Sequence, residues 1–365
     1  MTIYVDHTHL GRHVTGLERI TLELFSPEAL APLNVTPVLA QGTGRMVATQ
    51  TLGLPARLLN SSSILLCPGF PPSPLLWPFA TRVVPYIHDI FLLSRRDDLN
   101  RRARLYMAEP FRLAVRTYPR FLVNSADTKR KLATCCRSDA EIMLYRPPVR
   151  NVFNIRPDSR SEREEKPPSL RLVTLGTIEP RKNFAAATKI LSALRAHGFP
   201  DATLEIVGRQ GWGDDWNKLE KCPGVILHGY QAGDRVNQIL QNSDVFICTS
   251  HEEGLGLPLL EAQYAGLPIV APDAAVFREV LDQSGIFINP ADPASAANTI
   301  IAAISVPEWR VLHAARAAQN LTRWNALASA DRDAVIDFIA RLAHGKARPV
   351  TAPAPLNQKD RNITL

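Results

Sequence analysis

The sequence of 365 residues contains no apolar run that reaches the roughly 18 residues needed to cross a bilayer. Its first residues, MTIYVD, show no basic segment followed by an apolar one, so we expect no secretory signal peptide. No repeat of solenoid period is visible either. These absences argue against a membrane-spanning, secreted or repeat protein, and we expect a protein that works in the cytoplasm.

Cysteine is scarce, and the metal-binding residue types form no specific pattern. The five cysteines are Cys67, Cys135, Cys136, Cys222 and Cys248. They lack the spacing of a zinc site, which favours reduced thiols in a cytosol. No Asp-x-Asp lies in a metal-binding context, and the spacing of His7, His9 and His13 in one loop is not specific for a metal. We therefore expect no metal, and we expect His9 and His13 to be solvated.

Positive charge is in modest excess. The sequence has 42 Lys and Arg against 35 Asp and Glu, which gives a net charge of +7. A basic surface favours anionic partners such as nucleotide phosphates, acidic lipids or nucleic acid. Nucleic acid has no supporting motif in this sequence. The densest basic region runs from Arg95 to Arg120 and is expected to be mostly helical. It is either a solvated face or a contact for an anionic acceptor or membrane surface.

Apolar strand-like segments alternate with amphipathic segments along most of the chain, which predicts two α/β domains with parallel sheets covered on both faces. We assign residues 1–150 to the first domain and residues 170–323 to the second. The polar, charged segment 151–169 reads as the linker. Two further helices are expected at 309–320 and 324–344, and the proline-rich segment 345–365 is expected to be a disordered tail.

One stretch, residues 249–271, has the pattern strand end, glycine loop, helix, strand. Pro258 suits the first turn of a helix, and Gly266 suits its left-handed end. A loop at a helix N-terminus favours phosphate, because free N–H groups and the positive end of the helix dipole meet there. Glu253 and Glu261 bracket this loop, with seven residues between them. Each either complements the helix dipole or accepts hydrogen bonds from a vicinal diol such as a ribose.

Other candidate ligand residues follow predicted strands, at the edge where open parallel sheets bind ligands. Gly16 lies in the loop after the first strand, and a glycine there lets the backbone approach a phosphate. His88 follows the strand at 82–87. It is either a ligand to a sugar hydroxyl or a core or capping histidine. Arg181 and Lys182 follow the strand at 170–175. Together they can neutralise a diphosphate without a metal, unless they belong to a merely solvated basic loop.

The stretch 249–271, with both glutamates, the glycines, Pro258 and A-G-L-P-I-V, resembles the signature of the family-4 retaining glycosyltransferases. The segment from Gly176 to Asn183 resembles the second signature of that family. This resemblance implies the GT-B fold, with two Rossmann-like domains facing across a cleft and a last helix that crosses back to the first domain. It also implies that the nucleotide-sugar donor lies mainly on the second domain.

The resemblance also implies a role for each candidate residue in binding the donor. Arg181 and Lys182 grip the donor diphosphate, while Glu253 and His88 hold the sugar. Glu261 holds the ribose, and the turn at Gly229 and Tyr230 meets the base. The loop backbone that faces the diphosphate belongs to Gly254, Leu255, Gly256 and Leu257. These residues would stabilise the negative charge that forms on the leaving phosphate.

The implied reaction is transfer of a hexose, with mannose from GDP-mannose preferred over glucose from a UDP donor, to a glycan or lipid-linked saccharide in cell-surface polysaccharide synthesis. Retention needs no protein nucleophile here, since the leaving phosphate oxygen can act as the base. Two alternatives remain open: a nucleotide-sugar epimerase or hydrolase of similar form, and a non-catalytic scaffold of a polysaccharide assembly complex. Contact with the inner face of an anionic membrane is a further expectation.

Overall fold

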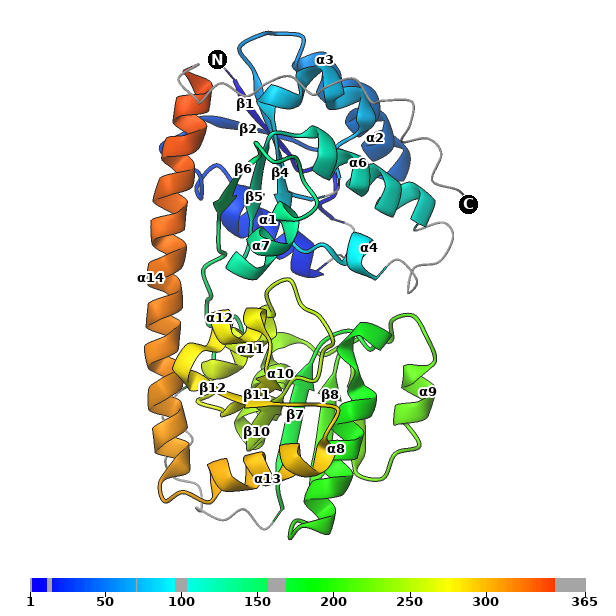
Figure 1. Ribbon diagram of the computed structural model, residues 1–365, viewed down its shortest axis with the longest axis vertical. Coiled ribbons are helices and arrows are strands. Elements are labelled where there is room, and N and C mark those ends of the chain that lie inside the picture. The colour runs from blue at the N-terminus through cyan, green and yellow to red at the C-terminus, as the bar shows by residue number, and fades with distance from the viewer. Residues whose placement is uncertain (1, 12–14, 70, 96–103, 157–168, 345–365) are drawn as a thin grey trace. The chain divides into compact units, whose positions relative to one another are not determined.

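The structure, a computed structural model, describes residues 2–11, 15–69, 71–95, 104–156 and 169–344 (Figure 1). The expectations for His13, for most of the linker, for the tail and for part of the basic region therefore lie outside the described residues. The chain divides into two compact units. Met1–Pro147 and Ala330–Leu365 form the first unit, and Pro148–Ser329 form the second.

The first unit is built on a six-stranded sheet of order β2-β1-β3-β4-β5-β6, in which all neighbouring strands are parallel. Its strands are β1 (Ile3–Asp6), β2 (Val35–Val38), β3 (Ile64–Cys67), β4 (Val83–Ile87), β5 (Arg120–Val123) and β6 (Glu141–Leu144). Its helical segments are α1 (Thr15–Phe25), α2 (Thr43–Ala48), η1 (Thr49–Gly53), α3 (Leu54–Arg57), η2 (Pro74–Arg82), α4 (Phe91–Ser94), η4 (Arg104–Ala108), α6 (Glu109–Thr117) and α7 (Ala126–Ala133).

The second unit repeats this plan with a parallel sheet of order β12-β11-β10-β7-β8-β9. Its strands are β7 (Arg171–Leu175), β8 (Thr203–Val207), β9 (Val225–Gly229), β10 (Val245–Ile247), β11 (Ile269–Pro272) and β12 (Gly285–Ile288). Its helical segments are η6 (Pro180–Lys182), α8 (Phe184–Ala196), α9 (Asp215–Leu219), α10 (Gly233–Asn242), α11 (Leu257–Gln263), α12 (Ala275–Leu281), η7 (Asp282–Ser284) and α13 (Pro293–Ile304).

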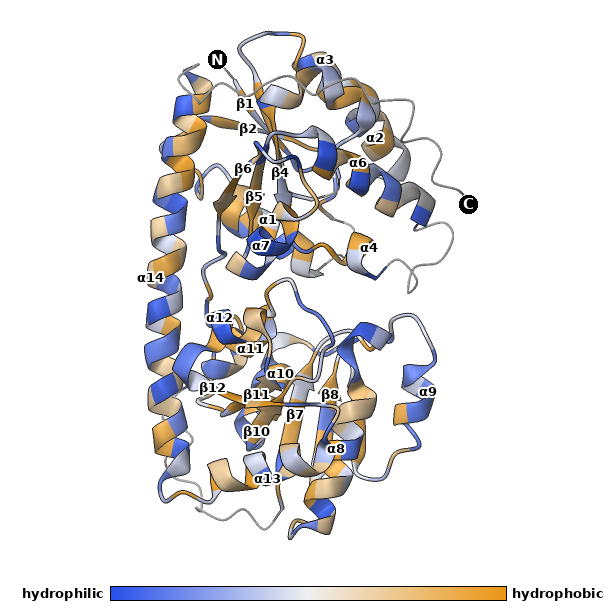
Figure 2. Ribbon diagram, in the orientation of Figure 1, coloured by the Kyte–Doolittle hydropathy of each residue, from blue (hydrophilic) through white to orange (hydrophobic). Residues whose placement is uncertain are grey.

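Two neighbouring strands in each unit are buried along their whole length. Every residue of β3, β4, β10 and β11 is buried, and Figure 2 shows hydrophobic strands at the labels β10 and β11. A parallel sheet covered on both faces requires such continuous apolar strands, because neither face meets water. The prediction of two α/β units with parallel sheets is therefore confirmed.

Helix α14 (Trp309–Ala343) belongs to both units, with the change after Ser329. In the second unit, Arg310 donates to Asp244 over 2.9 Å. In the first unit, Asp331 accepts from Arg146 over 2.7 Å. Both ion pairs join buried or nearly buried side chains, so α14 is fixed to each unit by a charge pair as well as by apolar packing.

The sequence placed a break between two helices near Asn320, and this is wrong, because α14 is continuous through that position. The amide nitrogen of Asn320 donates to Gln263 and to the carbonyl of Val280. Because the Asn320 side chain makes these hydrogen bonds, it does not replace the backbone hydrogen bonds of the helix. The helix therefore continues through this residue. None of the helices in the described ranges is both long enough and apolar enough to cross a membrane.

The boundary of the second unit also differs from the predicted one at residue 170, since it begins at Pro148. Val149 explains part of this difference. Its N–H donates to Asn325 of α14, and its carbonyl accepts from Tyr264, the residue after α11. These contacts attach the chain to the second unit well before β7 begins.

Candidate donor-binding site

The loop between β10 and α11 has the geometry that its glycines predict. Gly256 precedes α11 with a left-handed φ of 84°, and a Cβ built on it would lie 2.4 Å from Cδ1 of Leu259. Both the backbone conformation and the lack of space require glycine at this position. The helix begins at Leu257, with Pro258 in its first turn as predicted. Gly266 then takes the left-handed conformation, with φ 64°.

Glu253 is the centre of a charged cluster in this loop, and its side chain is only 8% exposed. Its Oε1 accepts from Nζ of Lys182 over 2.6 Å and from Oγ of Ser250 over 2.7 Å. Its Oε2 accepts from Nη1 of Arg181 over 2.8 Å. Burial alone would raise the pKa of Glu253, but the charges of Lys182 and Arg181 outweigh it and lower the pKa to about 2. Glu253 is therefore an anion at any physiological pH.

Arg181 and Lys182 reach Glu253 because β7 and β10 are neighbouring strands, so that the loops after them meet at one edge of the sheet. Two side-chain contacts hold these loops together. Oγ1 of Thr249 donates to the carbonyl of Asn183 over 2.9 Å, and Arg181 donates to the carbonyl of Glu252 over 2.9 Å. Asn183 supports the sharp turn into α8 with a left-handed φ of 51°. The two cations are thus held in place by the fold.

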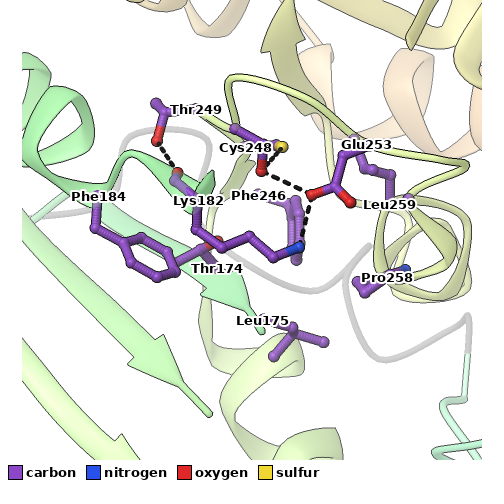
Figure 3. A pocket seen from close by; sticks show the side chains of 12 residues that line it. Thr174, Leu175, Lys182, Phe184, Phe246, Cys248, Thr249, Glu253, Pro258 and Leu259 are labelled. Carbon is purple, nitrogen blue, oxygen red and sulfur yellow. Dashed lines mark hydrogen bonds and ion pairs between the residues drawn. The ribbon is translucent and has the colours of Figure 1, made fainter. Parts of the chain in front are cut away.

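A small pocket lies beside this cluster (Figure 3). Figure 3 shows Lys182 extended to the carboxylate of Glu253, with Pro258 and Leu259 of α11 on the far side of that carboxylate. Cys248 donates from its thiol to Ser250, over 3.4 Å. The pocket therefore brings the glycine loop, the start of α11 and the loop after β7 to one place.

The remaining candidates of the second unit have different surroundings. Glu261 lies in the second turn of α11 and is 5% exposed, so its carboxylate does not face bulk solvent. Leu255 and Leu257 are also buried. Gly229 ends β9 with φ 66°, and the side chain of Tyr230 beyond it is 63% exposed.

Two candidates, His88 and Gly16, lie in the first unit. His88 follows β4, and its Nε2 lies 2.7 Å from the carbonyl oxygen of Pro68. Since a carbonyl only accepts, Nε2 carries the hydrogen and Nδ1 the lone pair. Burial lowers the pKa of His88 to about 4, so the ring is neutral near pH 7. Gly16 is exposed and lies in the first turn of α1, which begins at Thr15, and not in the loop where the sequence placed it.

The expectation that His9 lies in a solvated loop is wrong. His9 is fully buried, and its Nε2 is 2.9 Å from Oγ1 of Thr21 in α1. His7 is also buried, at 4% exposure. The loop after β1 is polar in sequence, but it is covered by α1 and by the chain near Gly69. In the part of the chain that the structure describes, no group of three or more His, Cys, Asp or Glu side chains is placed to hold a metal ion.

Residues 169–305, which include the whole charged cluster, match the family model described as glycosyl transferases group 1. The match covers less than half of the chain. The curated relatives include O-antigen chain mannosyltransferase B of Escherichia coli, 29% identical over 39% of this chain and 39% of its own length. Another is the serotype-specific mannosyltransferase WbdA of Escherichia coli, 31% identical over 39% of this chain and 17% of its own length. The matches thus span about two fifths of these relatives or less.

Solved structures extend the comparison to both units. WaaG, a glycosyltransferase involved in lipopolysaccharide biosynthesis, is similar over 93% of this chain and 99% of its own, with a TM-score of 0.64 and 15% identity. Anabaena Alr3699/HepE, solved in complex with UDP and glucose, has a TM-score of 0.65 and 16% identity over the same shares. At this identity the likeness concerns the fold, and it confirms the predicted GT-B class of two Rossmann-like units.

Three residues in the segment that matches the family model were not recognised from the sequence. Ser250 binds Glu253, Glu179 accepts from Arg181 over 2.8 Å, and the Arg209 guanidinium lies 4.6 Å from the centre of the Tyr230 ring. Glu179 was visible next to Arg181, and Ser250 was visible three residues before Glu253. Nothing in the sequence indicated the contact of Arg209 with Tyr230, because this contact depends on the loops after β8 and β9 lying side by side.

We expect the first unit to lose stability as the pH falls from 6.5 to 4, in part through His88. The folded pKa is about 4 and the ordinary value is 6.5, so the unfolded chain binds a proton in this range while the folded chain does not. The contribution of His88 to this loss is about 3 kcal/mol of unfolding free energy. Urea unfolding of the wild type and of His88→Gln at several pH values measures it. The exposed His197→Gln is the control, and equal pH dependence of wild type and His88→Gln would contradict the assignment.

Proposed function

We propose that this chain is a retaining glycosyltransferase that moves a hexose from a nucleotide-diphosphate sugar to a glycan or lipid-linked saccharide. The observation that carries the proposal is the cluster of Glu253, Arg181 and Lys182 in the segment that matches the family model. Two cations held at the carboxyl edge of a parallel sheet, beside a glycine loop, suit a diphosphate without requiring a metal. The curated relatives that are mannosyltransferases make a mannosyl donor the first candidate.

The paired state of the cluster suggests how a donor would bind. Arg181 is bound by Glu179 and Glu253, and Lys182 by Glu253. An arriving diphosphate offers both cations more negative charge than one carboxylate does. We infer that Arg181 and Lys182 turn from Glu253 to the phosphates, and that Glu253 is then available to accept hydrogen bonds from sugar hydroxyls.

Charge development explains what these residues would do in the reaction. When the bond from the sugar to the diphosphate breaks, negative charge grows on the leaving phosphate, and Arg181 and Lys182 stabilise it in place. The backbone of Gly254 and Leu257 faces the same charge in this proposal. The acceptor hydroxyl attacks the face that the leaving group vacates, and the leaving phosphate oxygen takes its proton, so the configuration is retained.

His88 would bind the sugar as a neutral ring. Its Nε2 is committed to the carbonyl of Pro68, so that Nδ1 accepts a hydrogen bond from a sugar hydroxyl. Glu261 would hold the ribose diol. Tyr230, whose ring is exposed on one side and stacked by Arg209 on the other, would receive the base next to Gly229. Guanine fits the mannosyl donor, and uracil is the alternative.

The first unit would meet the acceptor and an anionic membrane surface on the cytoplasmic side. The basic region from Arg95 to Arg120 supports this contact. A second support is that the sequence holds no Asp or Glu between Glu28 and Asp89. Within that segment Leu52 is 67% exposed and Leu59 75% exposed. Exposed leucines in an acid-free segment suit a lipid surface better than water.

A thermal-shift screen with GDP, UDP, ADP and dTDP, each with and without EDTA, tests the donor site. Binding to the native state raises the melting temperature by mass action. We expect one diphosphate to raise it, EDTA to leave the shift unchanged, and Arg181→Ala or Glu261→Ala to remove it. If no nucleotide raises the melting temperature, the donor-site proposal is wrong and a non-catalytic scaffold is favoured. Release of free sugar from the sugar nucleotide without an acceptor would favour the hydrolase.

A further inference from the structure

A second pocket, which we call the α8 pocket, lies along the first turns of α8 in the second unit. It is lined by α8, by the loop after β10, by the last residue of β11 and by the chain that follows β12. Its volume is about 430 Å³, within the range of ordinary small-molecule sites. Its polar lining consists of Asn183, Lys189, Thr249, Ser250, His251 and Asn289. The rest of the lining is alanine and proline, so the pocket has an apolar wall and a polar wall.

The charge of the α8 pocket is positive. Lys189 is exposed at its rim, and no carboxylate is among the lining residues. Three acids follow lining residues in the sequence, namely Glu252, Asp273 and Asp292, and none of them is itself a lining residue. Asp273 accepts from Arg278 over 2.7 Å, and Asp292 accepts from the N–H of Ser295 over 3.0 Å. Within the described ranges Lys189 makes no ion pair, so its charge is available to a ligand.

The donors of the polar wall are held by the same contacts that build the Glu253 cluster. Thr249 and Ser250 line both pockets. Thr249 donates to the carbonyl of Asn183, and Ser250 donates to Glu253. The N–H of His251 donates to the carbonyl of Arg181 over 2.9 Å. The α8 pocket is therefore separated from the cluster by a fixed wall of two residues.

We propose that the α8 pocket binds a small molecule that carries a phosphate group, with the phosphate at Lys189 and an uncharged body against the alanines and prolines. Lysine binds phosphate as a point charge, and the amides of Asn183 and Asn289 add hydrogen-bond donors. This site is distinct from the donor site and does not depend on the proposed transfer reaction. A ligand there lies against Ser250, so it also biases the hydroxyl that orients Glu253.

Calorimetric titration of the full chain with glucose 1-phosphate, inorganic phosphate and glucose tests this site. We expect glucose 1-phosphate to bind and glucose to bind at least about tenfold more weakly, since glucose lacks the charged group that makes a charge-assisted hydrogen bond to Lys189. Equal affinity for inorganic phosphate would support the phosphate site and identify the free ion as its ligand. Absence of binding by either phosphate compound, or equal affinity for glucose, would overturn the proposal.

Variants separate this site from the donor site. Lys189→Gln removes the charge and Ala291→Trp fills the pocket, and each is expected to weaken binding at least about tenfold. Lys221→Gln, an exposed lysine elsewhere in the same unit, is the matched control. Arg181→Ala should leave the affinity unchanged. Loss of binding in Arg181→Ala, together with full binding by Lys189→Gln and Ala291→Trp, would place the phosphate at the donor site and overturn the proposal.

Discussion

Glu253→Gln is expected to lower the free energy of unfolding of the second unit by about 3 kcal/mol, and inorganic diphosphate is expected to restore part of that loss. Glu253 is the shared partner of Arg181 and Lys182, and it is nearly buried. Glutamine keeps the shape but leaves two cations without their counter-charge in a partly desolvated site. Arg181 still forms its ion pair with Glu179 in this variant. The expected loss of unfolding free energy is therefore at the lower end of the range for a broken buried ion pair.

The pH dependence of the same variant gives a second measure of this prediction. The folded pKa of Glu253 is about 2, below its ordinary value of 4.5. Its contribution to stability is therefore complete above pH 4.5 and is lost as the pH falls towards 2. Glu253→Gln should lack this part of the acid sensitivity. Denaturant unfolding with and without diphosphate measures both effects, and Glu220→Gln, an exposed glutamate of the same unit, is the control. Equal stability of the two variants would contradict the role given to Glu253.

Arg181→Ala and Lys182→Ala are each expected to lower the rate of transfer by about 100-fold to 1,000-fold. Each cation is fixed at the edge of the sheet before any ligand arrives, so it needs no rearrangement of the backbone to meet the diphosphate. Arg181→Lys should not restore the rate, because a lysine lacks the planar fork that bonds Glu179 and Glu253 at once.

The measurement is release of nucleoside diphosphate from the sugar nucleotide that the thermal-shift screen identifies, over a range of donor concentrations, so that kcat and KM are both obtained. Lys221→Gln serves as the control for loss of one exposed positive charge, and the melting temperature of each variant shows whether it is folded. A variant that raises KM and leaves kcat unchanged would show that its cation binds substrate and transition state equally. That result would remove the charge-stabilising role from the residue.

Most of the secondary structure could be predicted because its causes are local. The strands predicted at 82–87 and 170–175 end where the structure ends them and begin one residue later, since their apolar runs can be recognised from the local sequence. The glycine at position 256 was informative because a left-handed backbone tolerates few other residues. Asn320 misled the prediction, because its partners, Gln263 and Val280, are distant in the sequence.

The sequence by itself determined the two α/β units, the residue types at the ends of their strands and the resemblance of Glu253, Arg181 and Lys182 to a donor-binding signature. Only the tertiary structure decided that these three side chains bind one another, since Lys182 and Glu253 are 71 residues apart in the chain. It also decided that His9 is buried, that Arg209 stacks on Tyr230, and that Lys189 faces a second pocket. Each of these depends on which strands are neighbours, and strand order is set by packing between segments rather than by any one of them.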